Sequence, residues 1–491
     1  MKRLLLTIMV SMAMLMGFGL TSCNSDEERA EILKVYNWGD YIDEDLIAEF
    51  EAWYEQQTGR KVSVIYQTFD INEVMLAKIE NGHADFDVVC PSEYIIERMM
   101  RQDLLVPIIT PEFLSEINSR GINYFGCISP YIKEQFSLLE APEGHNPNDY
   151  AVGYMWGTTG ILYNERYVTR EEASSWGLMF DERLRDKIFV KDAFRDVYST
   201  MLIYAKTLEA RESGELAEDG ILDLDTIHQL MYDSSDESIA LVESHLKRMK
   251  ELVAGWEADF GKEMMTQEKA WINLMWSGDA VWAIEEATDV DVELAYTVPD
   301  EGSIVWFDGW VIPKYAANVD AACYFINYMC KPENAIRNML ATGYVSVVAT
   351  EEVFEEIGEL SSGEQEVVDL SYLFMHEDGT VIEGADSVLV DPVLYPDRSV
   401  IDRCGVMHDS GSRTDKMLEM WSRVKGDNLS TGMLIGIILF FSLLLIFGIA
   451  RKVDKYRRNK AYLKHRRHHA ERKTKNENKK ETTHTTIKSN N

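Results

Sequence analysis

The chain has 491 residues, a net charge of −34 at neutral pH and 46% apolar residues, enough for two or more folded domains. The charge is uneven: the segment from Arg451 to the end carries 15 Lys and Arg against four Asp and Glu, which leaves about −45 on residues 1–450. This acidic excess disfavours nucleic acid as a partner and favours cations, although a solvated acidic surface that only aids solubility explains most of the carboxylates equally well.

The first predicted element is a secretion signal over residues 1–22. Two basic residues precede an uncharged run over residues 4–20, as in signal peptides. The ending Leu20-Thr21-Ser22-Cys23 resembles the cleavage site of bacterial lipoproteins. Cys23 would then be lipidated and become the new N-terminus. The alternative is ordinary cleavage that leaves Cys23 as a free thiol.

The first hundred residues after the signal alternate predicted strands and helices. Strands are predicted at Ile32–Asn37, Lys61–Gln67 and Asp87–Cys90, and helices at Asp43–Gln57, at Asn72–Glu80 and from Pro91-Ser92 to Gln102. The first helix has the clearest pattern, because its apolar side chains share one face and Gly59 follows its end. This βαβαβα order is typical of an α/β fold with a parallel sheet and helices on both faces.

The turn after the first strand, Asn37-Trp38-Gly39-Asp40-Tyr41, combines two aromatic rings with a carboxylate. In α/β proteins such turns lie where ligands bind. The carboxylate of Asp40 suits an ammonium group, while the rings of Trp38 and Tyr41 suit a carbon chain. The alternative is an aromatic turn packed into the core, with Asp40 as an acid at a helix N-terminus. The turn alone does not decide between them.

The middle of the chain is interpreted as a second lobe of strands and helices. Strands are predicted at Tyr150–Asn164, Ile188–Lys191, Ala280–Ile284, Val292–Val298 and Ser303–Pro313. Helices are predicted at Ala193–Ala210, Leu241–Trp256, Gln267–Trp276, Asn318–Cys330, Pro332–Ala341 and Ser410–Val424. Ser303–Pro313 is expected to carry the chain back toward the first lobe. Residues 351–397 are hard to assign and are interpreted as an insertion.

The last predicted element is a transmembrane helix at residues 428–450. This run contains no charged residue and corresponds to about 34 Å of helix, enough to span a bilayer. Arg451 and Lys452 follow at once, so the positive-inside rule puts the basic tail, residues 451–491, in the cytoplasm and residues 23–428 outside. A buried core helix is the alternative, but it does not explain the flanking positive charges.

The remaining cysteines, Cys90, Cys127, Cys323, Cys330 and Cys404, are odd in number and form no CxxC pair. Neither a disulfide framework nor a zinc site is indicated, and we interpret them as buried free thiols. The sequence contains no HExxH, no GxSxG and no phosphate-binding loop. It therefore predicts a protein that is not an enzyme and that has no metal or cofactor.

Seven short motifs occur in the order and spacing of one known family. They are Asn37-Trp38-Gly39-Asp40-Tyr41, Pro91-Ser92-Glu93-Tyr94, Tyr154-Met155-Trp156-Gly157, Arg195-Asp196, Trp276-Ser277-Gly278-Asp279-Ala280, Val305-Trp306-Phe307-Asp308 and Thr342-Gly343-Tyr344. Over roughly residues 32–425 the chain resembles the polyamine-binding lipoproteins, the spermidine/putrescine receptors of bacterial ABC importers. The resemblance implies a two-lobed periplasmic-binding-protein fold with a hinge, a polyamine ligand, and a permease and ATPase complex as partners.

The resemblance also sets the expected domain bounds. We expect lobe 1 at residues 23–145, continued at about 306–350. Lobe 2 is expected at residues 146–305, continued at about 351–427. The transmembrane helix and the basic tail lie outside the family's usual pattern.

The family's roles imply a set of ligand-binding residues in this chain. They are Trp38, Asp40, Tyr41, Ser92, Tyr94, Asp196, Trp276, Trp306, Asp308 and Tyr344. The acids would take ammonium groups, the tryptophans would cover methylenes, and the hydroxyl groups would add hydrogen bonds. Trp306 and Asp308 support a site, because residues two apart on a strand face the same side. The alternatives are core tryptophans, a surface helix acid at Asp196 and a helix cap at Ser92.

Three positions depart from the family. Gly39 stands where a hydroxyl residue is common, and Ala193 stands where some members have a second carboxylate. Met407-His408 stands where some members use an amide. Fewer carboxylates on one side suit a shorter or differently placed amine, so the choice among putrescine, spermidine and another cation stays open.

The C-terminal helix allows two further roles. In the first, the chain is a membrane-anchored sensor that reports polyamine levels through residues 428–450. The tail that follows is too short and too polar for a folded output domain, which counts against signalling. In the second, the helix fixes the receptor beside its permease and raises its effective concentration there.

Overall fold

Three parallel strands begin the fold, in the order β2-β1-β3: β1 (Ile32–Trp38), β2 (Ser63–Phe69) and β3 (Val88–Val89). The helices α3 (Asp45–Thr58), α4 (Asn72–Glu80) and α5 (Glu93–Arg101) follow them in turn, in the computed structural model. In α3 the buried side chains of Leu46, Phe50 and Tyr54 recur at helical spacing, and Gly59 ends the helix in the left-handed conformation. The predicted βαβαβα order and α/β fold class are therefore confirmed.

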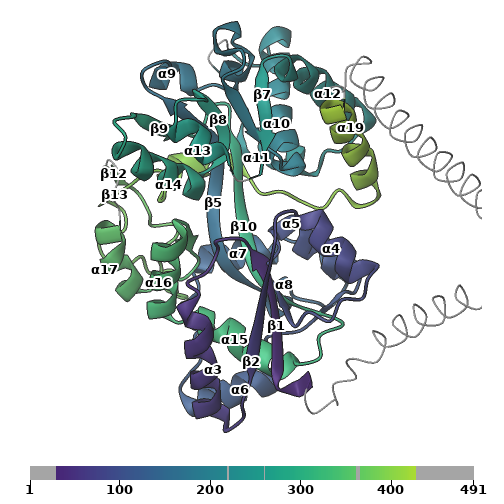
Figure 1. The fold of residues 1–491 in the computed structure, drawn as a ribbon, viewed down its shortest axis with the longest axis vertical. Helices are drawn as coiled ribbons and strands as arrows, with labels where there is room; N and C mark the ends of the chain where they lie inside the picture. Colours follow the sequence, from purple (N-terminus) through teal and green to yellow (C-terminus); the bar gives the residue numbers. More distant parts are fainter. Residues whose placement is uncertain (1–28, 218–219, 259, 361–364, 427–491) are drawn as a thin grey trace, which may run out of the picture. The chain divides into compact units, whose positions relative to one another are not determined.

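Two long antiparallel strands, β5 (Ala151–Asn164) and β10 (Ser303–Pro313), join the two halves of the structure (Figure 1). Every residue of both strands is buried. β10 pairs with β3 through Val311 and Val89, and the far end of β5 pairs with β8 (Ile272–Trp276) and β9 (Leu294–Thr297). We call the elements around β1 to β3 the first half and those around β6 to β8 the second half.

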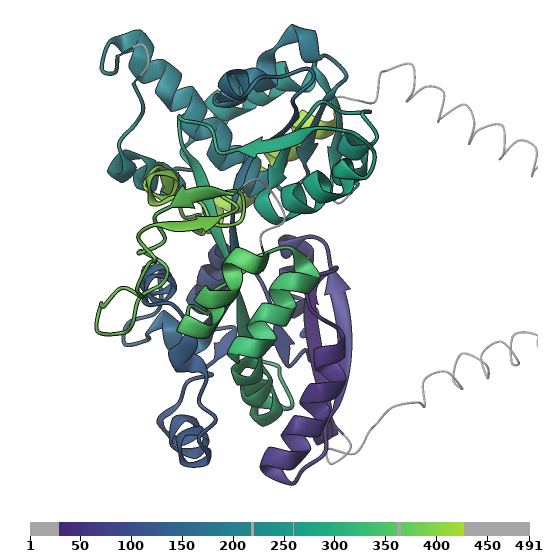
Figure 2. The ribbon, with the colours of Figure 1, turned by 90° about the vertical axis from the view of Figure 1, so that its left-hand side faces the viewer.

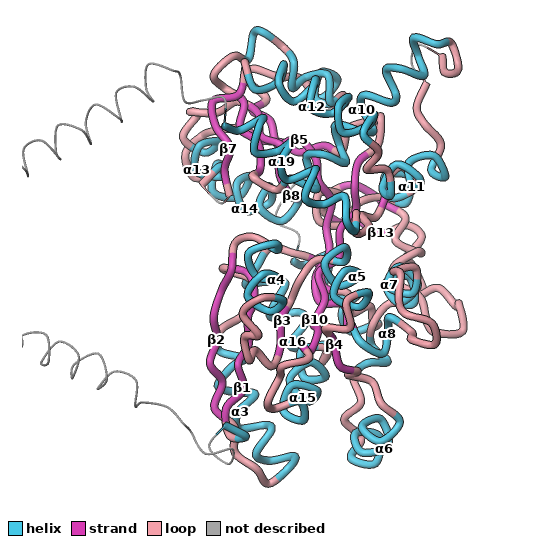
Figure 3. Tube along the Cα trace, turned by 90° about the vertical axis from the view of Figure 1, so that its right-hand side faces the viewer, coloured by secondary structure: helices cyan, strands magenta, loops and turns pink. Residues whose placement is uncertain are grey.

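The second half continues the sheet in the order β5-β8-β6-β7, with β6 (Ile188–Lys191) and β7 (Val253–Glu257) parallel to each other. Its helices are α9 (Arg170–Ala173), α10 (Phe194–Ser213), α11 (Leu224–Tyr232), α12 (Asp236–Lys250), α13 (Gly261–Thr266) and α14 (Ser277–Thr288). Helices flank the strands of both halves, and β2 lies at the edge of the first half (Figure 3). The topology is that of a periplasmic-binding-protein fold, with strands of both halves ending near β5 and β10.

Three predicted elements of the second half are wrong. The helix predicted at Leu241–Trp256 ends at Lys250 and is followed by β7. The end of the helix predicted at Gln267–Trp276 is the buried strand β8, and the strand predicted at Ala280–Ile284 lies within α14. For β8 the reason is physical: a short apolar run buried on all sides lacks a period that distinguishes strand from helix.

The remaining elements complete both halves. They are β4 (Leu105–Val106), α6 (Pro111–Arg120), α7 (Pro130–Ser137), α8 (Pro147–Tyr150), α15 (Val319–Met329), α16 (Pro332–Thr342), β11 (Val345–Ser346), α17 (Glu351–Leu360), β12 (Glu366–Val368), β13 (Val388–Val390), α18 (Arg398–Ile401), β14 (Cys404–Gly405) and α19 (Thr414–Gly426). β14 pairs in parallel with the start of β10.

The segment interpreted as an insertion packs on the first half and on β5. α17 lies beside α16 (Figure 2), and the β12–β13 hairpin follows α17. The Ser129 hydroxyl, at the start of α7, donates to the Leu373 carbonyl over 2.6 Å. The Tyr372 ring packs edge-on against Tyr131 of α7 and Trp156 of β5. This segment therefore covers the outside of the connection between the halves.

The structure describes residues 29–217, 220–258, 260–360 and 365–426. No helix within these ranges is long and apolar enough to cross a membrane. The predicted signal peptide, Cys23, the span at 428–450 and the basic tail lie outside them. The five other cysteines are free thiols, as expected, and all but Cys127 are fully buried.

Candidate functional site

Several helix starts and strand ends meet between the two halves. Acidic side chains occupy the first turns of α4, α5, α10 and α14, at Glu73, Glu93, Asp196 and Asp279. A helix N-terminus stabilises negative charge, which explains why acids are placed there locally. The ends of β1 and β8 add Trp38 and Trp276, and the middle of β10 adds Trp306 and Asp308.

Asp308 is held by two hydroxyl groups of the first half. Its Oδ1 accepts from the Ser92 hydroxyl over 2.7 Å, and its Oδ2 accepts from the Tyr41 hydroxyl over 2.9 Å. The side chain is buried, and the strand register of β10 shifts directly after it. Burial raises the pKa of Asp308 to about 7, with a further contribution from Asp196, although the two hydroxyl donors oppose the shift.

Asp196 supplies a second buried carboxylate, from the second half. Its Oδ1 accepts from the Trp276 indole nitrogen over 2.8 Å and from the Thr159 hydroxyl over 3.3 Å. Burial raises its pKa as well, while these donors and the adjacent Arg195 oppose the shift. The sequence alternative of a surface helix acid is therefore excluded, because Asp196 is only 7% exposed.

Two further acids belong to the cluster and escaped the sequence analysis. Glu73 accepts from the Tyr94 hydroxyl over 2.9 Å, and Glu93 accepts from the Phe307 amide over 2.9 Å. Burial raises the pKa of Glu73, and it raises the pKa of Glu93 well above its usual value, which favours the neutral form. The available signal was their position, in first helical turns that follow strand ends.

Aromatic rings from both halves form a continuous row beside these acids. Ring centroids lie 6.4 Å apart for Trp38 and Trp276, 6.4 Å for Trp276 and Trp306, and 5.5 Å for Trp306 and Tyr344. Tyr41 continues the row, 5.2 Å from Tyr344. Ring faces carry negative potential, so the row adds to the attraction of the site for cations and also offers apolar surface.

A further buried carboxylate beside the row, that of Asp279, already has cationic partners. Asp279 Oδ1 accepts from the Tyr344 hydroxyl over 3.0 Å, and Oδ2 accepts from the Lys191 ammonium over 2.6 Å. Burial opposes ionisation of Asp279, but Lys191 and Lys262 hold its pKa below the usual value. Lys191 was missed because nothing in the sequence distinguishes it from any residue that ends a strand.

Asp308 and Asp196 differ from Asp279: within the described ranges, neither forms an ion pair with a Lys or Arg side chain. Arg195 is the nearest candidate by sequence, but its guanidinium donates to the carbonyls of Met231 and His408, over 3.1 and 2.9 Å. A buried carboxylate without a cation is costly, so this arrangement favours a bound cation.

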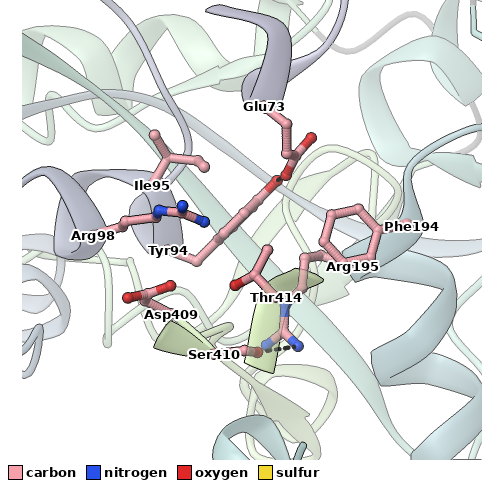
Figure 4. Close-up of a pocket in the computed structure, with 9 residues that line it drawn as sticks. All are labelled: Glu73, Tyr94, Ile95, Arg98, Phe194, Arg195, Asp409, Ser410 and Thr414. Atoms are coloured by element: carbon pink, nitrogen blue, oxygen red, sulfur yellow. Dashed lines mark hydrogen bonds between the residues drawn. The ribbon is translucent and has the colours of Figure 1, made fainter. Parts of the chain in front are cut away.

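A small pocket adjoins the cluster at Glu73 and Tyr94 (Figure 4). Arg195 also lines it and points its guanidinium toward Ser410, which accepts from Arg195 over 3.2 Å. Two acids, Glu73 and Asp409, and two arginines, Arg98 and Arg195, line the pocket, so their formal charges cancel. The pocket is therefore less suited to a cation than the surroundings of Asp308.

The structure brings together nine of the predicted residues, namely Trp38, Tyr41, Ser92, Tyr94, Asp196, Trp276, Trp306, Asp308 and Tyr344, and their roles as ligand contacts stay predictions. Asp40 is placed differently: it is exposed, in a left-handed conformation with φ 50°. Among the departures, Ala193 precedes α10 as its N-cap, and the His408 ring stacks on Tyr232 with centroids 3.8 Å apart.

Comparison with known proteins gives one family. A family model described as a bacterial extracellular solute-binding protein matches residues 45–356, more than half of the chain. A spermidine/putrescine-binding periplasmic protein of Escherichia coli is 24% identical over 330 residues, covering 67% of this chain and 80% of its own. A putrescine-binding periplasmic protein of the same organism is 28% identical over 318 residues, covering 61% and 74%.

A solved structure shares the fold. It is the substrate-binding protein of a spermidine/putrescine ABC transporter from Streptococcus pneumoniae. It aligns with a TM-score of 0.54 and 27% identity, covering 80% of this chain and 98% of its own.

Proposed function

Because the chain belongs to the bacterial extracellular solute-binding proteins, we propose that it binds spermidine or putrescine outside the cytoplasm and delivers the amine to an ABC permease. Members of this family are receptors and not enzymes. The named ligands of its relatives in Escherichia coli and Streptococcus pneumoniae support polyamines as the ligand class.

One observation carries the proposal: Asp308 and Asp196 are buried carboxylates that have no cationic partner among the described residues, and they lie beside the rings of Trp276 and Trp306. A polyamine has ammonium groups joined by methylenes, so it supplies both the missing charge and the apolar chain. An ammonium over a desolvated Trp face gains about 2 kcal/mol. A micromolar site needs about 8 kcal/mol in total. Two ion pairs and a few ring contacts are of that order.

The proposed mechanism is closure about a hinge. Asp308 accepts hydrogen bonds from Ser92 and Tyr41 of the first half, while Asp196 and Trp276 belong to the second half. A ligand that contacts both groups stabilises the closed arrangement, which the permease then recognises. We propose that the hinge lies between lobe 1 (residues 23–145 and about 306–350) and lobe 2 (residues 146–305 and about 351–427).

Saturable binding of spermidine or putrescine to the full chain is the expected result of isothermal titration calorimetry. The reason is that each amine neutralises carboxylates that otherwise remain buried and unpaired. Absence of heat for both amines, and for other diamines and triamines, would contradict the proposal. Titration with an uncharged diol of similar length serves as the control and is expected to give no binding.

We further propose that the receptor is anchored twice, through a lipid on Cys23 and through a membrane span at residues 428–450, with the basic tail in the cytoplasm. The charge pattern of both ends supports this topology. The span would hold the receptor at the membrane that carries the permease.

Deletion of residues 428–491 tests the second anchor. The truncated receptor is expected to bind polyamine with unchanged affinity, because the cluster around Asp308 lies far from this segment in the sequence. Uptake of labelled polyamine by cells is expected to fall, because the receptor loses the proximity that raises its effective concentration. Unchanged uptake at equal receptor abundance would refute a role for this anchor in transport.

A further inference from the structure

Lys191 places an ammonium group of the protein itself beside Trp276 of the aromatic row. The side chain is fully buried at the end of β6. Its Nζ donates to Asp279 over 2.6 Å and to the Ala258 carbonyl over 3.0 Å. The same atom lies 4.5 Å from the centroid of the Trp276 ring. A carboxylate and a ring face thus hold this ammonium as they would hold that of an organic cation.

The carboxylates beside the row therefore differ in their partners. Asp279 and the nearby Glu257 face two ammonium groups: Lys191 lies 3.5 Å from Glu257, and Lys262 lies 3.8 Å from Asp279. Asp308 and Asp196 have hydroxyl and indole donors in place of ion pairs.

We propose that Lys191 is a specificity-determining residue: its ammonium occupies Asp279, so the site prefers amines with two ammonium groups to longer amines with three. The proposal rests on the polyamine-binding function proposed above. Asp308 and Asp196 offer two unpaired carboxylates, which match a diamine such as putrescine. A third ammonium that reached Asp279 would meet Lys191.

Like-charge repulsion explains the exclusion. Asp279 is connected to the row through the Tyr344 hydroxyl and lies beside Trp276 through Lys191. An ammonium that reached Asp279 would face the Lys191 charge, with the Asp279 carboxylate already engaged. Inside a protein such repulsion is much less screened than in water. Removing the Lys191 charge would instead leave Asp279 with only the more distant Lys262, 3.8 Å away, and so make it available to a third ammonium.

The test compares putrescine and spermidine by calorimetry on the full chain, with and without Lys191→Met. In the variant, the ratio of the spermidine Kd to the putrescine Kd is expected to fall at least tenfold. The double variant Lys191→Met/Asp279→Asn keeps the gained space but removes the carboxylate, so the ratio is expected to return toward that of the unmodified chain. An unchanged ratio in Lys191→Met, or an equal fall in both variants, would overturn the proposal.

The unmodified chain provides a second test that does not depend on whether the variant folds. It is expected to bind putrescine at least as tightly as spermidine. Spermidine binding tenfold tighter than putrescine would overturn the proposal for Lys191 while leaving the polyamine function intact. Binding of neither amine would instead contradict the polyamine function itself.

Discussion

Replacing Asp308 with Asn is expected to weaken polyamine binding at least about 100-fold. The carboxylate is buried and lies between Ser92 and Tyr41, so it would pair with an ammonium group away from water. Removing one partner of such a buried pair costs about 2–5 kcal/mol, and each 1.4 kcal/mol is about tenfold in Kd. Calorimetry with putrescine measures the loss. Asp225→Asn, an exposed acid on α11, serves as the matched control with unchanged Kd.

The same substitution is expected to leave the ligand-free protein as stable as before, or more stable, at pH 8. The pKa of Asp308 is raised to about 7 in the folded state. Its stabilising contribution is therefore complete at low pH and is lost as pH rises through about 7. The difference from the usual Asp value corresponds to a cost on the order of 4 kcal/mol above that pH. A melting temperature several degrees lower for the variant at pH 8 would contradict this account.

Polyamine affinity is expected to fall as pH decreases, with Kd about tenfold higher at pH 6 than at pH 8. Asp308 has a pKa of about 7 in the ligand-free protein, so at pH 6 most molecules carry a protonated carboxyl that cannot pair with an ammonium. The amine stays charged in this range, because alkyl ammonium groups ionise near pH 10. Calorimetry at a series of pH values between 5.5 and 8.5 measures the change.

Proton release identifies the cause of that pH dependence. At pH 6 binding is expected to displace about one proton from Asp308, so the observed heat depends on the ionisation enthalpy of the buffer. At pH 8.5 the carboxyl is already ionised, and two buffers of different ionisation enthalpy are expected to give equal heats. Equal affinity at pH 6 and pH 8 would show that no carboxyl with a raised pKa takes part.

Much of the fold could be predicted from the sequence, because its first half is built from regular patterns. The amphipathic face of α3 and the turn residues around α4 give bounds within two residues of those observed. Prediction failed at β8, where apolar residues are buried on every side and the sequence period does not distinguish a strand from a helix, and it failed at the short apolar stretch that starts α14. The pairing of β8 with β5 determines that structure, and pairing over such a distance is not visible in local sequence.

The candidate site could be predicted in part, for a related reason. Trp306 and Asp308 are two residues apart on one strand, so the sequence already places them on one face. The sequence does not single out Lys191, because its contact with Asp279 joins residues 88 positions apart in the chain. Asp40 is predicted as a ligand contact from its motif. In the structure it is exposed and has a left-handed backbone conformation.

The burial of Asp308 links binding to stability in this account. The carboxylate destabilises the ligand-free protein at neutral pH, and the same lack of a cationic partner makes it available to an amine. A protein that satisfied Asp308 internally, as Lys191 satisfies Asp279, would be more stable and would bind a diamine less tightly. The contrast between these two carboxylates is the main functional feature of the site.

Structure determination of the putrescine complex tests the central claim most directly. In the complex, one ammonium nitrogen is expected within hydrogen-bonding distance of Asp308 and the other near Asp196, with the methylenes against Trp276 and Trp306. Lys191 is expected to remain on Asp279 in that complex. An amine bound elsewhere, or bound with the Asp308 carboxylate still lacking an ammonium partner, would contradict it.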